Sequence, residues 1–205
     1  MNSNVLPILY TFKRCPYAMR ARMAIYAAGI TVQSIEVSLK NKPQSLIDCS
    51  PKATVPVVVT PSGEVIEQSR DIMLWALHQA DPDNWLLQND TLAQQHMMQL
   101  VDSYDNEFKP LLDRYKYFDR HPEFSQAEYR QKAEFFLEKL DIRLAQHTFL
   151  MDDKIRFADV AIFPFIRQFA GVDASWFTES PYKNLQRWLG TCIHTAMFES
   201  IMKIK

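Results

Sequence analysis

Cys15 stands where a thiol can do nucleophilic or redox chemistry. It follows an apolar, strand-like run over residues 5–11 and the cationic pair Lys13 and Arg14, and Pro16 after it suits the first position of a helix. The N–H groups and the positive dipole end of a helix start stabilise an anion. Such surroundings pull the pKa of a thiol below about 8.5. The sequence therefore predicts a thiolate at neutral pH, and the alternative is a small buried hydrophobe.

Three further stretches could hold the ends of a ligand. Lys42 lies in a basic loop over residues 39–43, and Gln68 and Ser69 open a helix that forms a second anion-binding corner. Pro56 cannot donate to a sheet ladder, so Val55-Pro56 marks the entrance of a strand. A cis Val55–Pro56 bond would offer the backbone of Val55 to an extended ligand, but the composition leaves cis or trans open.

The elements that must position these residues alternate between strand and helix in the first 79 residues. The predicted order is strand 5–11, helix 16–28, strand 30–37, short helix 44–48, strand 55–59, strand 65–66 and a helix from Ser69. A strand–helix–strand unit favours parallel pairing of its two strands. This order predicts a thioredoxin-like half, a fold that would bring Cys15 and the Val55-Pro56 strand entrance together.

The remainder of the chain reads as helix only. A polar connector over residues 80–90 separates the first domain, residues 1–79, from an all-helical domain, residues 91–205. The expected helices are 91–117 with a kink or break at Pro110, 125–146 with a capping box at Ser125, an almost wholly apolar 156–169 at the centre, and one starting at Ser180-Pro181. The predicted fold class is an α/β thioredoxin-like N-terminal domain plus an all-α helical-bundle C-terminal domain.

The composition argues against several classes of function, among them nucleic-acid binding and membrane insertion. The 47% hydrophobic and 23% charged fractions are those of a globular protein, and a net charge of −1 predicts no attraction to nucleic acid or to an anionic membrane. We expect no membrane span and no signal peptide. Three widely spaced cysteines argue against a disulfide framework and favour the cytoplasm. The scattered histidines predict no metal site.

Four segments of the chain resemble the glutathione-site motifs of the cytosolic glutathione S-transferase family, in its cysteine-type, omega-like class and bacterial relatives. They are Arg14-Cys-Pro-Tyr-Ala-Met-Arg-Ala-Arg, Leu39-Lys-Asn-Lys-Pro, Ser50-Pro-Lys-Ala-Thr-Val-Pro-Val and Gln68-Ser-Arg-Asp-Ile. A fifth segment, Phe163-Pro-Phe-Ile-Arg-Gln-Phe-Ala, is similar to that bacterial group. The resemblance covers nearly the whole chain and implies the two-domain transferase architecture. It does not specify a substrate.

Carried over residue by residue, the resemblance implies a role for each site position. Cys15 would attack or bind the sulfur of glutathione. The carboxylates and the cysteinyl moiety of glutathione would be held by Lys42 (glycyl carboxylate), Gln68 and Ser69 (γ-glutamyl carboxylate) and the backbone of Val55, ahead of Pro56 as a cis-proline.

Two positions depart from the family pattern. Gln68 stands where the family often carries Glu, which puts in doubt how the γ-glutamyl amine is held. Arg156 stands where the family usually carries the Ser or Thr of a capping box, so Asp159 is expected to cap its helix through backbone N–H groups alone.

For several aromatic and acidic residues, the sequence leaves open whether they belong to the core or to the functional site. Tyr10 would either donate a hydrogen bond to a thiolate or pack in the core, whereas Phe12 and Tyr17 neighbour the thiol. The aromatic face that includes Tyr104 and Phe108 would be bundle core, with part of it available to line a pocket for an apolar co-substrate. Family dimers suggest that Asp102 or Asp105 reaches the glutathione of a neighbouring subunit.

The resemblance implies a glutathione-dependent thiol transferase or reductase of the thioltransferase or dehydroascorbate-reductase type, acting as a homodimer on a small-molecule or glutathionylated substrate. Cys15 would form a mixed disulfide with glutathione, and a second glutathione would resolve it. Ala18 stands where a resolving cysteine would sit, which argues against a dithiol mechanism. The alternatives are a transferase that conjugates glutathione to electrophiles and a non-catalytic interaction protein on the same scaffold.

Overall fold

The computed structural model describes residues 5–203, and the chain divides into two compact units. The first unit holds the chain up to Asp83 together with the segment that begins at Ala196, and the second runs from Asn84 to Thr195. The expected division placed all of 91–205 in the helical domain. Residues 1–4 and 204–205, at the ends of the two expected domains, lie outside the described residues. Within the described part, no helix combines the length and apolarity that a membrane span needs.

A four-stranded mixed sheet forms the centre of the first unit. Its strands are β1 (Ile8–Thr11), β2 (Gln33–Glu36), β3 (Val57–Val59) and β4 (Val65–Ile66), arranged in the order β2-β1-β3-β4. β1 runs parallel to β2, with Ile8 opposite Gln33, and antiparallel to β3, which pairs antiparallel with β4. The element order and the parallel pairing of the first two strands are as predicted, and the thioredoxin-like fold class is confirmed.

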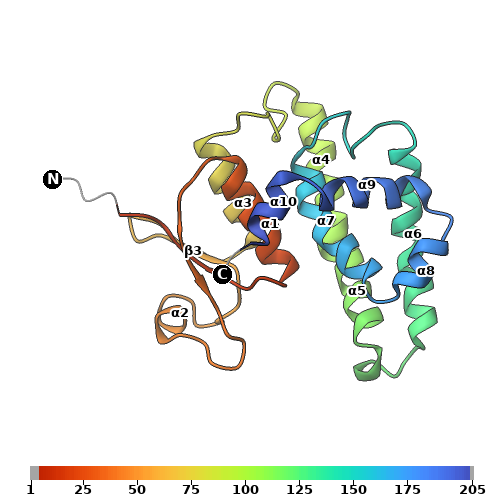
Figure 1. The fold of residues 1–205 in the computed structure, drawn as a ribbon, viewed down its shortest axis with the longest axis horizontal. Helices are drawn as coiled ribbons and strands as arrows, with labels where there is room; N and C mark the ends of the chain where they lie inside the picture. Colours follow the sequence, from red (N-terminus) through yellow and green to blue (C-terminus); the bar gives the residue numbers. More distant parts are fainter. Residues whose placement is uncertain (1–4, 204–205) are drawn as a thin grey trace. The chain divides into compact units, whose positions relative to one another are not determined.

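Helices cover both faces of this sheet. α1 (Pro16–Ala27) and α3 (Ser69–Gln79) pack side by side, and α2 (Gln44–Cys49) lies across β3 from them (Figure 1). Leu46 of α2 packs with Tyr10, Val37 and Val57 in one buried cluster. Alternate strand residues point to opposite faces, so Leu9 and Val58, both buried, face away from that cluster. α1 and α3 therefore lie on the face of the sheet opposite to α2.

The second unit consists of helices alone, and a last helix returns to the first unit. The elements are α4 (Thr91–Ser103), a π-helical turn (Tyr104–Phe108), α5 (Lys109–Lys116), a 3₁₀ turn (Phe118–Arg120), α6 (Gln126–Leu144), α7 (Phe157–Ala170), α8 (Ala174–Glu179), α9 (Lys183–Ile193) and α10 (Ala196–Ile201). α7 is buried along most of its length, as its apolar sequence predicted. α10 packs on α1, which explains why the chain from Ala196 belongs to the first unit.

One helix break occurs as predicted, and one helix start differs from the prediction. The α-helical run from Thr91 breaks at the π-helical turn, and Pro110 lies in the first turn of α5, where its missing N–H leaves no intrahelical bond unmade. Ser180-Pro181 does not start a helix: α9 begins at Lys183. Ser180 instead ends α8, a helix that the sequence did not predict, and its hydroxyl donates to the carbonyl oxygen of Phe177 at 2.7 Å. A serine before a proline suits either role, and the tertiary packing selected the other one.

Candidate functional site

Cys15 occupies the N-cap of α1 and Pro16 the first helical position, as the sequence predicted. The carbonyl oxygen of Cys15 accepts the first helical hydrogen bond, from the N–H of Met19 at 2.9 Å. Its thiol, partly exposed, lies 3.6 Å from the carbonyl oxygen of Val55 and donates to it. The Val55–Pro56 peptide is cis. The fold therefore joins the helix start and the strand entrance, which are 40 residues apart in the sequence.

Arg22 braces the loop that leads to Cys15. Its guanidinium is buried and donates to the hydroxyl of Thr11 at 2.6 Å and to the carbonyl oxygens of Phe12 and Lys13 at 3.3 and 3.0 Å. Burial lowers the pKa of Arg22 to about 10, and attraction to Glu36 and to Cys15 offsets part of that lowering. Because that attraction is mutual, a positive charge acts on the Cys15 sulfur from within the protein.

The other two cysteines are poor candidates for thiolates. Burial raises the pKa of Cys49, whose thiol donates to the carbonyl oxygen of Leu46 at 3.4 Å. Burial raises the pKa of Cys192 further, and the nearby Asp159 adds to that effect. No disulfide joins the three cysteines. Only Cys15 lies at the start of a helix beside a buried cation.

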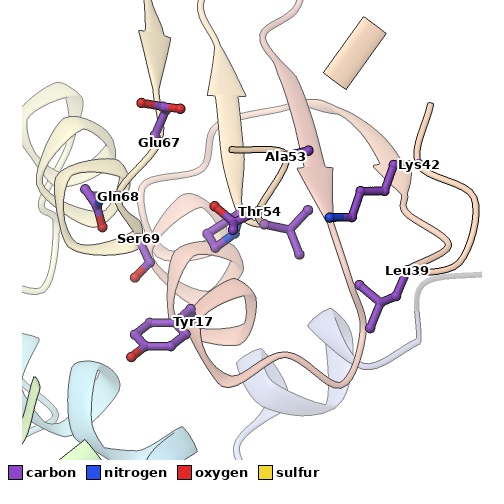
Figure 2. Close-up of a pocket in the computed structure, with 10 residues that line it drawn as sticks. Tyr17, Leu39, Lys42, Ala53, Thr54, Glu67, Gln68 and Ser69 are labelled. Atoms are coloured by element: carbon purple, nitrogen blue, oxygen red, sulfur yellow. The ribbon is translucent and has the colours of Figure 1, made fainter. Parts of the chain in front are cut away.

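A pocket of about 460 Å³ lies in the first unit next to the cysteine. It is lined by Tyr17, Leu39, Lys42, Ala53, Thr54, Val55, Pro56, Glu67, Gln68 and Ser69. Figure 2 shows Lys42 on one side, Gln68 and Ser69 on the other, and Thr54 between them. The sulfur of Cys15 does not line the pocket but lies against Val55, which does.

The two sides of the pocket both favour negative charge. Lys42 supplies an ammonium on one side. On the other, α3 begins at Ser69, and its N-cap residue Gln68 makes no side-chain capping bond. The positive dipole end of a helix favours an anion at such a start. The one carboxylate in the lining, Glu67, accepts a hydrogen bond from the hydroxyl of Ser50 at 2.6 Å and lies 3.9 Å from the amino group of Lys52. A ligand with a carboxylate at each end matches this distribution.

The remaining sequence candidates fall in different places. Phe12 is half-buried and does not line the pocket. The guanidinium carbon of Arg14 lies 5.6 Å from the centre of the Phe12 ring. Tyr10 packs in the sheet core, the second of its two readings. Tyr104 and Phe108 are 1% and 0% exposed inside the helical unit, where the hydroxyl of Tyr104 donates to a backbone carbonyl at 2.6 Å. Full burial makes both of them bundle core.

Asp102 and Asp105, which were suggested to reach the glutathione of a neighbouring subunit, both lie in helical segments. Asp102 belongs to the end of α4 and Asp105 to the π-helical turn that follows. Their place within one subunit does not test a contact with another, so that suggestion remains a prediction.

Four lining residues were not singled out from the sequence: Leu39, Ala53, Thr54 and Glu67. Two of them, Thr54 and Glu67, directly precede a residue that was singled out, and Ala53 lies two positions before Val55. Backbone neighbours of a binding residue share its loop, which is the signal that could have found them. Within residues 5–203, no group of three or more His, Cys, Asp or Glu side chains could hold a metal ion.

Comparisons with known proteins identify the family of this chain. Residues 9–85 match the glutathione S-transferase N-terminal domain, and residues 123–191 match the glutathione S-transferase C-terminal domain. A probable glutathione transferase of Aplysia californica is 38% identical over 81 residues, which are 40% of this chain and 86% of that protein. The chain belongs to the glutathione S-transferase family.

Two further relatives of this transferase family member span more of the chain. Glutathione S-transferase omega-1 of Sus scrofa is 25% identical over 165 residues, 80% of this chain and 68% of that protein. A solved glutathione transferase family member from Pseudomonas fluorescens, with two glutathione bound, shares the fold with a TM-score of 0.82 at 18% identity. That match covers 100% of this chain and 96% of the other. The pocket described above thus belongs to the N-terminal transferase domain.

Proposed function

We propose that this family member is a glutathione-dependent thiol transferase, or reductase, in which Cys15 forms a mixed disulfide with glutathione. The observation that carries the proposal is the position of the Cys15 sulfur. It lies at the start of α1 and 3.6 Å from the carbonyl oxygen of Val55, on the border of a pocket whose two ends favour carboxylates. Glutathione has two carboxylates and a thiol between them.

Glutathione is proposed to lie across the pocket in one direction. Lys42 binds its glycyl carboxylate, and Ser69 with Gln68 at the start of α3 binds its γ-glutamyl carboxylate. The backbone of Val55 pairs with its cysteinyl residue, ahead of Pro56. When Cys15 ionises, its thiol no longer donates to the carbonyl oxygen of Val55, and that oxygen becomes available to the cysteinyl N–H of glutathione.

The proposed reaction is two thiol–disulfide exchanges. The Cys15 thiolate attacks the glutathione sulfur of a substrate disulfide, the Cys15–glutathione S–S bond forms, and the substrate sulfur leaves as a thiolate that takes a proton from water. The thiolate of a second glutathione then attacks the bound glutathione sulfur. Oxidised glutathione leaves, and the thiolate of Cys15 is restored. Over the cycle, one glutathione thiol is consumed and one substrate thiol is produced, and the disulfide broken in the substrate is replaced by the disulfide of oxidised glutathione.

A single cysteine suffices for this cycle. The residue three positions after Cys15 is Ala18, which cannot resolve the mixed disulfide, so a second glutathione does. The start of α1 and the buried charge of Arg22 stabilise the thiolate. The proposal also includes a homodimer in the cytoplasm, where thiols are kept reduced.

Intact-protein mass spectrometry after exposure to oxidised glutathione tests the reaction. We expect one glutathione adduct on the wild type, its removal by reduced glutathione, and no adduct on Cys15→Ser. Cys49→Ser is the matched control, because burial raises the pKa of Cys49, and it should form the adduct as the wild type does.

Four results would contradict the proposal. An adduct on Cys49 or the absence of an adduct would remove the exchange mechanism. Conjugation of glutathione to an electrophile that persists in Cys15→Ser, without any reductase activity in the wild type, would assign a conjugating transferase. No binding of glutathione at all would indicate an interaction protein on this scaffold.

A further inference from the structure

Ser69 receives a hydrogen bond from a buried arginine of the neighbouring helix. Nε of Arg20, on α1, donates to the hydroxyl oxygen of Ser69 at 3.0 Å. Arg20 is 3% exposed and Ser69 4% exposed, so water competes little for this bond. Ser69 also lines the pocket, at the first residue of α3. The bond therefore joins a buried charge to the pocket wall.

The chemistry of the two groups fixes the direction in which the Ser69 hydroxyl can act. A guanidinium has five donors and no acceptor, so the Ser69 oxygen must accept from Arg20. The hydroxyl has a single hydrogen, and that hydrogen cannot point at Arg20. It is left for an acceptor elsewhere, and the pocket beside the first turn of α3 is the place where a ligand acceptor would sit.

The position of Arg20 is itself restrained. Its guanidinium carbon lies 5.2 Å from the ring centre of Tyr17, which lines the pocket on the same side as Ser69 (Figure 2). α1 packs along α3, so the arginine and the serine come from two helices that hold each other in place. A fixed positive charge behind the first turn of α3 adds to the positive dipole end of that helix.

We propose that Arg20 is a positioning residue for the γ-glutamyl carboxylate of glutathione: it holds the Ser69 hydroxyl as a donor toward the pocket. This inference rests on the proposed function, because it assigns a role within the same glutathione site. Arg20 acts through Ser69 and does not itself line the pocket.

The test is a double-mutant cycle read by isothermal titration calorimetry with two ligands. The proteins are wild type, Arg20→Met, Ser69→Ala and the double variant, and the ligands are reduced glutathione and 4-aminobutanoyl-cysteinyl-glycine, which lacks the γ-glutamyl α-carboxylate. Each single substitution should weaken glutathione binding about tenfold, as loss of a hydrogen bond to a charged group does. When Ser69 is already alanine, the Arg20 substitution should lower the affinity for glutathione by less than about threefold.

The analogue separates positioning from general structural damage. Neither substitution should weaken analogue binding by more than about twofold, because the group that Ser69 binds is missing. Equal losses for both ligands, or fully additive losses in the double variant, would overturn the role of Arg20. Arg20→Lys keeps a buried cation and a donor, and it should retain more glutathione affinity than Arg20→Met; no difference between them would also count against the proposal.

Separate control measurements test whether each variant folds and whether the wild type binds glutathione. Circular dichroism and a thermal melt establish that each variant is folded, and if Arg20→Met is not, the ratio of the two ligand affinities in Arg20→Lys decides the question. A wild type that binds no glutathione would remove the proposed function itself. A wild type that binds glutathione, with uncoupled Arg20 and Ser69, would remove only this inference.

Discussion

At the scale of single residues, position within the pocket separates Lys42 from its chemically identical neighbour Lys40. Both lie in one basic loop, yet Lys42 is half-buried and lines the pocket, whereas Lys40 is exposed and does not. A lysine ammonium is a point charge whose effect on a carboxylate falls with distance and with exposure to solvent. The proposed contact with the glycyl carboxylate therefore belongs to Lys42 alone.

Replacing Lys42 by methionine should weaken glutathione binding about five- to tenfold, the worth of one partly exposed charge-assisted bond. Calorimetric titration with glutathione and with its glycyl ethyl ester measures the effect. The ester has no glycyl carboxylate, so it should bind both proteins alike. Lys40→Met is the matched control and should bind glutathione like the wild type. An equal loss for Lys42→Met and Lys40→Met would assign the effect to general electrostatics.

At the scale of elements, the start of α7 is held by a buried acid. Oδ1 of Asp159 accepts from the N–H of Leu150 at 2.9 Å and from the indole Nε1 of Trp188 at 2.8 Å, and Oδ2 accepts from the N–H of Arg156 at 2.9 Å. The sequence predicted capping through backbone N–H groups alone. The indole is an addition that only the packing of α9 on α7 supplies.

The pKa of Asp159 gives this helix start a pH dependence. Burial raises the pKa of Asp159 to about 6, against an ordinary value of 3.8, although its hydrogen bonds act in the opposite direction. Between these two values the folded chain holds a proton that the unfolded chain has lost. The stability contributed by this group is therefore present at low pH and falls as the pH rises toward about 6.

Urea unfolding of the wild type and Asp159→Asn at pH 5 and pH 7.5 measures that dependence. Asparagine cannot ionise, so the wild type should lose about 1 kcal/mol of unfolding free energy relative to the variant over this range. The variant should be the less stable protein at both pH values, because its amide nitrogen cannot accept from a backbone N–H. A constant difference between the two proteins would mean that Asp159 is already ionised at pH 5.

At the scale of the whole molecule, the chain builds two cores that do not follow a single cut in the sequence. The first unit needs the segment from Ala196, because α10 packs on α1 and buries Phe198 and Ile201 to 4% and 6% exposure. The last described helix thus supports α1, the helix whose N-cap is Cys15. Residues far apart in the sequence stabilise one unit.

Phe198→Ala should therefore destabilise the first unit, although it is placed near the C-terminus. Loss of a buried phenylalanine costs about 3–5 kcal/mol. Hydrogen exchange followed by mass spectrometry should show lower protection of α1 and α3, with α6 and α7 little changed. Phe135→Ala, which removes a phenylalanine that is 54% exposed, should change neither unit. Loss of protection confined to α6 and α7 in Phe198→Ala would contradict this assignment.

The sequence by itself determined the features of this protein that depend on local chemistry. Pro16 after Cys15, the capping box at Ser125 and the strand–helix–strand order are set by backbone restrictions within a few residues, and each occurs where it was predicted. Its nearly continuous apolar sequence also identified α7 as the buried helix, because a helix that is apolar nearly all round has no polar face to expose to water.

The tertiary structure decided the features that depend on distant partners. Ser180 ended one helix where it was expected to start another, and Asp159 gained an indole from α9, because both choices depend on what packs nearby. The order of elements predicted that Cys15 and Val55 would meet, but only the tertiary structure gives the 3.6 Å contact between these residues, which lie 40 positions apart. The bond from Arg20 to Ser69 joins residues 49 positions apart, and no local pattern encodes it, because its two groups meet only when α1 packs on α3.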